Sequence, residues 1–238
     1  MCGRYTLHTE KEALAERFEF DPAALAPQSA RYNIAPTQNV LTLRAAGGAR
    51  RPELMRWGLV PSFAKEIGSL AHTINARVET LAVRSAFKES LRAKRCLVLA
   101  DGFYEWEPAG GPRKSKLPYL VARADGEPFA MAGLFAEWRR RGELLGETLL
   151  SCAIVTTAAN AAVARLHDRM PVILPREAEA RWLDPTLDGD TEALLALLSP
   201  VPPAELTSHP VSRRVNSVKN DDPSLLQPDD SEPSLGFF

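Results

Sequence analysis

Several features that would point to a membrane, a secretory route or a metal centre are missing from this 238-residue sequence. No apolar run approaches the roughly 20 residues needed to span a bilayer, and the N-terminus lacks the basic-then-apolar pattern of a secretory signal. The four histidines are scattered and show no metal-ligand spacing. These absences predict a cytoplasmic protein that binds no metal.

Cysteine is also scarce, with three residues and no CxxC pair. Cys96 and Cys152 lie in the apolar runs RCLVLA and LLSCAIVT, so both are predicted to be small core residues. Cys2 is therefore the cysteine whose thiol is the candidate for a chemical role.

Basic residues are not in excess over the whole chain, whose formal net charge is −1. The charge is uneven, because the last 18 residues hold five acids and no Lys or Arg. Taking those five from the total of 30 acids leaves 25 acidic against 29 basic residues in 1–220. That mild excess permits a local basic groove for nucleic acid without demonstrating one.

Turn-forming residues divide the chain into short segments. A capping box from Thr9 to Glu12 predicts a helix beginning after Thr9, with Leu14 and Phe18 on one face. Residues 26–38 are predicted to form a loop, because Pro, Gln, Ser and Asn are frequent there. Further helices are predicted near 159–165, 176–183 and 191–199, and strands at 40–44, 53–57, 96–106, 118–123, 129–135 and 149–156.

The order of these segments mixes runs of strands with isolated helices, which favours the α+β class over repeated βαβ units. We expect a single compact domain over residues 1–220, built around a curved, largely antiparallel and barrel-like β-sheet with flanking helices. Residues 221–238 are predicted to be an acidic, disordered tail. A monomer is the default expectation.

Cys2 combines two nucleophiles if the initiator methionine is removed. The free α-amine has a reference pKa of about 7.7–8.0 and the thiol about 8.5, so both are partly deprotonated near neutrality. The amine can condense with an aldehyde to a Schiff base, and the thiol can then close onto the imine carbon as a thiazolidine ring. Gly3 admits close backbone approach, and Arg4 offers a phosphate partner. Considered alone, position 2 slightly favours the alternative that it simply tolerates many residue types and that Cys2 has no function there.

Three other residues carry groups suited to this chemistry. His167 beside Asp168 could act as an acid or base near pH 7, although a lone histidine is more often structural. Glu105 shares a strand face with Phe103, where burial would raise its pKa, although the pattern alone favours an exposed glutamate. Asn75 could orient a substrate by its amide, and Arg77 shares its face if the stretch is extended.

Seven motifs in order give these residues a context. Together they resemble the SRAP (SOS-response-associated peptidase) family, also called abasic-site processing proteins, from residue 2 to about 220. The motifs are MCGRY at the N-terminus, RYNIAPTQ at 31–38, WGLVPSFAK at 57–65, INARVET at 74–80, ADGFYEW at 100–106, HDRMPVIL at 167–174 and HPVSRRVNSVKN at 209–220.

The resemblance implies a DNA-damage response protein that attaches itself to DNA, with Cys2 cross-linking covalently to abasic sites in single-stranded DNA. Glu105 would assist sugar ring opening and cross-link reversal, His167 would transfer protons in lyase-type Schiff-base chemistry, and Asn75 would orient the sugar or the amine. No metal or organic cofactor is implied. Residues expected to line the DNA channel are Arg4, Asn33, Pro36, Phe63, Arg77, Thr156, Thr157 and Arg169.

One motif departs from the family pattern. The block usually reads W-G-L-x-P-x-W, and Phe63 stands here in place of the second tryptophan. Phenylalanine stacks with less area, so the preferred DNA structure could differ while the chemistry stays the same. The apolar end of the acidic tail, residues 234–238, suggests a peptide for a replication partner such as the sliding clamp.

Other functions stay open at this point. N-terminal-nucleophile glutamine amidotransferases also begin Met-Cys-Gly, but their accompanying motifs are missing here. A thiol autopeptidase that removes its own Met1 could use Cys2 and His167. A non-covalent module that binds single-stranded DNA would need only the basic groove.

Overall fold

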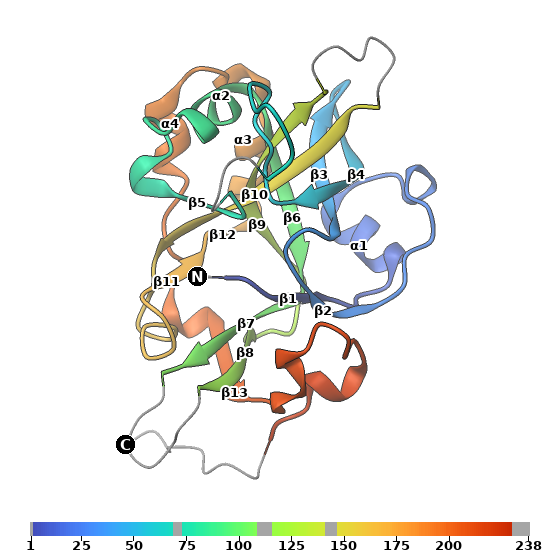
Figure 1. The fold of residues 1–238 in the computed structure, drawn as a ribbon, viewed down its shortest axis with the longest axis vertical. Helices are drawn as coiled ribbons and strands as arrows, with labels where there is room; N and C mark the ends of the chain where they lie inside the picture. The colour runs from blue at the N-terminus through green and yellow to red at the C-terminus, as the bar shows by residue number, and fades with distance from the viewer. Residues whose placement is uncertain (1, 69–72, 109–115, 141–146, 230–238) are drawn as a thin grey trace.

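Two β-sheets organise the chain, and the computed structural model describes them through residues 2–68, 73–108, 116–140 and 147–229 (Figure 1). The smaller sheet has the strand order β13-β8-β7-β1-β2, formed by Leu206–Pro210, Leu117–Arg123, Gly102–Glu107, Tyr5–Leu7 and Arg31–Ile34. The larger has the order β11-β10-β4-β3-β6-β9-β12, formed by Arg169–Pro171, Leu149–Ala158, Ala49–Trp57, Asn39–Ala46, Arg95–Ala100, Phe129–Trp138 and Ile173–Leu174.

The larger sheet curves until it closes on itself. Strand β9 pairs with both β6 and β10, so β10, β4, β3, β6 and β9 form a ring of strands. Strand β5, Asn75–Arg77, is added beside β10 in parallel, and β4 also runs parallel to β10. The other described strand pairs are antiparallel. The prediction of an α+β fold around a curved, largely antiparallel sheet is confirmed.

Strand β6 divides the core into two clusters. Side chains alternate between the faces of a strand, and every residue of β6 is buried. Leu97 and Leu99 belong to the cluster that the helices cover, whereas Cys96 and Val98 belong to the cluster that contains Cys2. Cys96 and Cys152 are fully buried, as predicted. The N-terminal cysteine therefore packs directly on the apolar core.

Four α-helices flank the sheets in the described part of the chain, and α2, α3 and α4 gather at the end of the molecule opposite β7, β8 and β13 (Figure 1). They are α1 Lys11–Phe18, α2 Ser85–Ala93, α3 Arg176–Leu183 and α4 Thr191–Ala196. The short 3₁₀ helices are Pro22–Ala24, Val78–Thr80, Pro185–Leu187, Pro203–Glu205, Arg213–Asn216 and Pro223–Leu226. Helix α3 has its predicted bounds, and α4 ends three residues before its predicted end.

Several predicted elements differ from the structure. Residues 159–165 form a turn instead of an α-helix, because the Asn160 side chain accepts bonds from the N–H groups of Ala162 and Val163. The predicted loop 26–38 contains β2, and the predicted strand 96–106 is β6 and β7 in different sheets. Helix α2 was not predicted.

The capping box at Thr9 is wrong, although the helix that it predicted exists. The Thr9 side chain donates to Asp101 Oδ1 at 2.7 Å, and the cap position of α1 is Glu10 without a side-chain bond. The Asp101 carboxylate also accepts from the Thr9 N–H at 2.8 Å. A tertiary contact thus replaces the local one and ties the end of β1 to the β6–β7 junction.

Disorder from residue 221 was predicted, and this is wrong for residues 221–229. Leu225 is fully buried in Pro223–Leu226, and Asp221 accepts from Arg31 Nε at 2.8 Å. The acids of this segment have basic partners that composition does not reveal. Residues 230–238, including the proposed clamp peptide 234–238, lie outside the described residues, and that partner stays a prediction.

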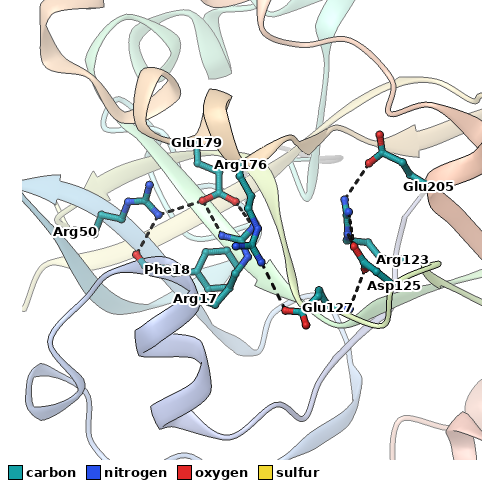
Figure 2. A network of polar contacts seen from close by, with 9 residues as sticks. All are labelled: Arg17, Phe18, Arg50, Arg123, Asp125, Glu127, Arg176, Glu179 and Glu205. Atoms are coloured by element: carbon teal, nitrogen blue, oxygen red, sulfur yellow. Dashed lines mark hydrogen bonds and ion pairs between the residues drawn. The ribbon is translucent and has the colours of Figure 1, made fainter.

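A buried carboxylate joins three elements that are distant in sequence. Glu179 of α3 is 1% exposed and bonds Arg17 of α1 at 2.7 Å and Arg50 of β4 at 3.1 Å (Figure 2). Arg50 also donates to the Phe18 carbonyl at 3.0 Å. Glu179 therefore holds α1 and α3 on the ring of strands.

Replacing Glu179 with alanine should lower the free energy of unfolding by about 3–5 kcal/mol, because it leaves two largely buried guanidinium groups without their charge partner. Urea unfolding followed by circular dichroism measures the loss. Glu127→Ala is the matched control, since Glu127 pairs with Arg176 at 3.7 Å on the surface and should contribute at most about 1 kcal/mol. Equal losses for both variants would contradict this assignment.

Candidate functional site

The N-terminal strand brings Cys2 to the edge of β7. Tyr5 lies opposite Phe103 in the antiparallel pair, and the Tyr104 N–H donates to the Arg4 carbonyl at 2.9 Å. Continued in the same register, the residues before Tyr5 run alongside Tyr104 and Glu105. Cys2 is fully buried there. The prediction that placed Cys2 and Glu105 in one site is consistent with this pairing.

Asn75 holds the Cys2 backbone from the larger sheet. It begins β5, where it pairs with Ile154 of β10, and its Nδ2 donates to the Cys2 carbonyl at 2.7 Å. The Asn75 side chain is 5% exposed, and its Oδ1 has no hydrogen-bond partner in the described part of the chain. Asn75 therefore fixes the position of Cys2 and leaves a buried acceptor beside it.

Glu105 is buried instead of exposed, contrary to what its sequence pattern alone favoured. Only 2% of the residue is accessible, because alternation along β7 puts Glu105 on the same face as the fully buried Phe103. Burial raises the pKa of Glu105 to about 7, although the positive charge of the chain's amino terminus opposes the rise. The carboxyl group is thus poised to gain or lose a proton near neutral pH.

The same burial acts on the Cys2 thiol. Burial raises the pKa of Cys2 well above its ordinary value, and the nearby charge of Glu105 raises it further. A bond from the Arg4 N–H opposes this shift. The thiol is therefore neutral at physiological pH.

His167 lies in the turn before β11. The Arg169 N–H donates to its Nδ1 at 3.0 Å, and the Asp168 carboxylate lies 2.7 Å from the same nitrogen. Burial is the largest cause that lowers the pKa of His167, and the positive charge of the amino terminus lowers it further. The structure thus joins Asn75 to Cys2 by a direct bond and runs the residues before Tyr5 alongside the strand that carries Glu105. That His167 acts at the same site stays a prediction.

The residues predicted to line a DNA channel divide into exposed and buried groups. Arg77 is exposed, and Pro36 is half-buried. Thr156 and Thr157 are buried in β10, and the Thr156 carbonyl accepts from Arg169 at 2.5 Å. Direct contact of DNA with the two threonine side chains would therefore require the protein to open.

Arg169 is held in place by an acidic partner. Its guanidinium bonds both carboxylate oxygens of Glu79, at 2.6 and 3.0 Å. The hydrogen bond from Arg169 is the largest cause of the lowered pKa of Glu79. Glu79, in the INARVET motif, was missed by sequence reasoning, although an acid four residues after Asn75 in the same motif was visible.

Arg4 and Asn33 contact each other away from the exposed surface. The Arg4 Nη1 donates to the Asn33 Oδ1 at 2.7 Å, and the guanidinium lies 5.9 Å from the centre of the Trp106 ring. Asn33 is fully buried. It therefore supports Arg4 in this structure, and Arg4 is the member of the pair with access to a ligand.

Phe63 is 44% exposed and lies beside α2. Together with Lys88 and Arg92 it lines an open hollow at the surface. Its described surroundings therefore belong to α2, whereas the cluster around Cys2 is built from β1, β5, β7 and the turn before β11. Two neighbours of that cluster, Trp106 and Lys116, were not singled out from the sequence, although Trp106 ends a motif that was.

No group of three or more His, Cys, Asp or Glu side chains is placed to hold a metal ion in the described part of the chain. None of the described helices is both long enough and apolar enough to cross a membrane.

Comparison with known proteins agrees with the ordered motifs. The model of the family described as SOS response associated peptidase (SRAP) matches residues 1–218. The abasic site processing protein YoqW of Bacillus subtilis is 39% identical over 95% of this chain and 99% of its own length. The abasic site processing protein YedK of Escherichia coli is 34% identical over 96% of this chain and all of its own length.

A solved structure has the same fold. A crystal structure of a protein from Bacteroides thetaiotaomicron superposes with a TM-score of 0.83 and covers 96% of this chain and all of that chain. The two sequences are 23% identical, so this likeness concerns the fold alone.

The raised pKa of Glu105 should make stability depend on pH. Its folded-state pKa of about 7 exceeds the ordinary value of 4.5, so the folded state binds the proton more tightly. Its favourable contribution is full below pH 4.5 and is lost as pH rises to about 7, amounting to ~3 kcal/mol. Urea unfolding of the parent and of Glu105→Gln at pH 4.5 and 7.5 isolates it. An unchanged difference between the two proteins would contradict burial of the ionisable carboxyl.

Proposed function

Because this chain belongs to the SRAP family, we propose that it acts in the DNA-damage response by attaching Cys2 covalently to abasic sites in single-stranded DNA. The observation that carries this proposal is the burial of Cys2 beside Asn75 and Glu105. An N-terminal cysteine would not need a proton-poised carboxyl and an amide clamp if position 2 were merely tolerant.

The first step of the proposed reaction uses the amine. Removal of Met1 frees the α-amine of Cys2, which attacks the aldehyde carbon of the ring-opened sugar; loss of water then gives an imine. Opening the sugar requires a proton transfer, and Glu105, with a pKa of about 7, holds or releases a proton at working pH. The unpartnered Oδ1 of Asn75 is a buried acceptor for the amine or for a sugar hydroxyl.

The thiol acts second. Since burial keeps the Cys2 thiol neutral, it adds as S–H across the carbon–nitrogen double bond. A carbon–sulfur bond forms, the proton ends on nitrogen, and the product is a five-membered thiazolidine. His167, with its lowered pKa, is a neutral base suited to moving that proton. The same groups would serve lyase-type chemistry at the imine.

A neutral thiol weighs against a cysteine peptidase as the main activity. Thiol peptidases use a thiolate, which needs a lowered cysteine pKa, and here burial moves the pKa upward. An autopeptidase role limited to Met1 would have to generate the thiolate transiently. We therefore place removal of Met1 before the reaction with DNA, by aminopeptidase or by the protein itself.

Cys2 variants separate the two chemical steps. Incubation of the parent with single-stranded DNA carrying one abasic site should give a band that survives boiling in detergent. Cys2→Ser keeps the amine and should give only an adduct that needs borohydride for trapping, because its hydroxyl closes poorly onto the imine. Intact DNA and duplex abasic DNA are the controls, and mass spectrometry verifies loss of Met1. No stable band from the processed parent would overturn the proposal.

Glu105→Gln should slow cross-linking by about 10²–10⁴-fold, because it removes a positioned proton donor and acceptor. Non-covalent binding should remain. The parent's rate should fall as pH rises through about 7 and Glu105 loses its proton, and the variant should lack that step. Single-turnover cross-linking from pH 5.5 to 8.5 measures both, and a persisting step in the variant would assign the titration to another group.

A further inference from the structure

The segment after β13 forms a closed loop against the smaller sheet. We name residues 211–229 the C-terminal strap. Val211 bridges to Pro228, and the Asp229 N–H donates to the Pro210 carbonyl at 2.9 Å, so the two ends of the strap lie together. The Val211 N–H also donates to the Pro118 carbonyl of β8 at 3.0 Å. The strap is therefore anchored on the sheet that carries Glu105.

Apolar side chains seat the strap on that sheet. Val211, Val215 and Leu225 are fully buried, and they form one cluster with Tyr104 and Leu120. A second anchor is polar: Asp221 accepts from the Tyr32 N–H at 2.5 Å and from Arg31. The strap is thus fixed to both β2 and β7, on either side of β1.

Asn33 is the hub between the strap and the N-terminal strand. Its Nδ2 lies within hydrogen-bond distance of three strap carbonyls, those of Val215, Ser217 and Asn220, at 3.2, 3.1 and 2.7 Å. Its Oδ1 accepts from Arg4 at 2.7 Å. Because Asn33 is fully buried, these contacts occupy its whole amide and it has no surface to offer to DNA.

Arg4 is oriented by this hub. Its Nη1 donates to Asn33 and also to the Val215 carbonyl of the strap at 2.7 Å. Trp106 lies beneath the guanidinium and donates from Nε1 to Asn216 Oδ1 of the strap at 2.8 Å. With Nη1 occupied, the Nε of Arg4 is a buried donor without a partner in the described part of the chain. Arg4 as a whole is only half-buried, so its charge stays within reach of a phosphate oxygen that approaches from the exposed side.

We infer that Asn33 and the C-terminal strap position Arg4 to bind a backbone phosphate next to the nucleotide held at Cys2. Asn33 is then a positioning residue that acts through Arg4, and the strap is part of the DNA-binding site. The inference rests on the proposed function, since it needs DNA at Cys2. It also explains why Arg4, two residues from the reacting cysteine, is tied to a segment more than 200 positions away.

The test measures non-covalent binding, so that it does not depend on cross-linking. The probe is single-stranded DNA with a tetrahydrofuran abasic analogue, which has no aldehyde to react. Full-length Arg4→Ala and Asn33→Ala should each weaken binding by about tenfold, because a hydrogen bond to a charged group is lost or misdirected. The double variant should bind within about twofold of Arg4→Ala, since Asn33 acts only through Arg4.

Salt dependence gives a readout that a purely structural role would not change. Each single variant should lower the slope of log K against log salt by ~0.7, the loss of one phosphate contact on a single strand. Additive losses in the double variant, or an unchanged slope for Asn33→Ala, would overturn the inference.

Asp221→Ala tests the role of the strap separately, and it serves if Asn33→Ala does not fold. It loosens the strap at a partly exposed ion pair without leaving a core cavity, and should weaken binding by about threefold. Asp125→Ala breaks a comparable Arg–Asp pair at the turn after β8 and should bind like the parent. Equal binding by the two variants would overturn the role of the strap. If the parent binds the analogue but forms no adduct with a true abasic site, the proposed function fails while the strap result still stands.

Discussion

The pairing of β1 with β7 is the constraint on which the candidate site depends. Tyr5 and Phe103 lie opposite each other and are both fully buried, so the apolar core fixes the register. A slip of one residue would turn every side chain of β1 to the other face. The same alternation that buries Phe103 also buries Glu105. Core packing and the poised carboxyl are consequences of one register, and Asp101 secures it by bonding Thr9 at the end of the strand.

Burying ionisable groups in this core costs free energy of folding. The same burial shifts their pKa values, and the shifted values are what the proposed chemistry uses. Burial raises the pKa of Glu105 to about 7 and keeps the Cys2 thiol protonated. A pKa near neutral pH is the value suited to general acid–base catalysis, and this applies to Glu105. The opposing stability comes from the apolar clusters on both faces of β6 and from the buried Glu179 network. Cys2 belongs to one of these clusters, so the packing that stabilises the fold is also what shifts the pKa of its thiol.

Local patterns predicted what depends on local physics. The period of apolar residues located α3 and the long strands, and the alternation in β7 correctly put Glu105 on the face of Phe103. The ordered motifs contain both Cys2 and Asn75, which the structure joins by a direct hydrogen bond, and the roles of Cys2, Asn75, Glu105 and His167 stay predictions. Sequence could not predict that Thr9 bonds Asp101 instead of capping α1, or that Asn33 is a buried hub, because those partners are distant in the chain. Short strands such as β2 and β5 are defined by pairing and carry little pattern of their own.

Residues 221–229 show why amino-acid composition wrongly predicted disorder in an acidic segment. Acidic residues without aromatic neighbours predict disorder because composition counts charges and not their partners. Here Asp222 meets Arg214 within the segment, and Asp221 meets Arg31 of β2. The buried side chains of the segment pack on the sheet and order it there. Its carbonyl at Val215 then accepts from Arg4, beside the reacting cysteine. The two ends of the described chain therefore meet at Arg4, and if Arg4 binds phosphate as we propose, its binding-competent orientation requires that residues 211–229 have already folded.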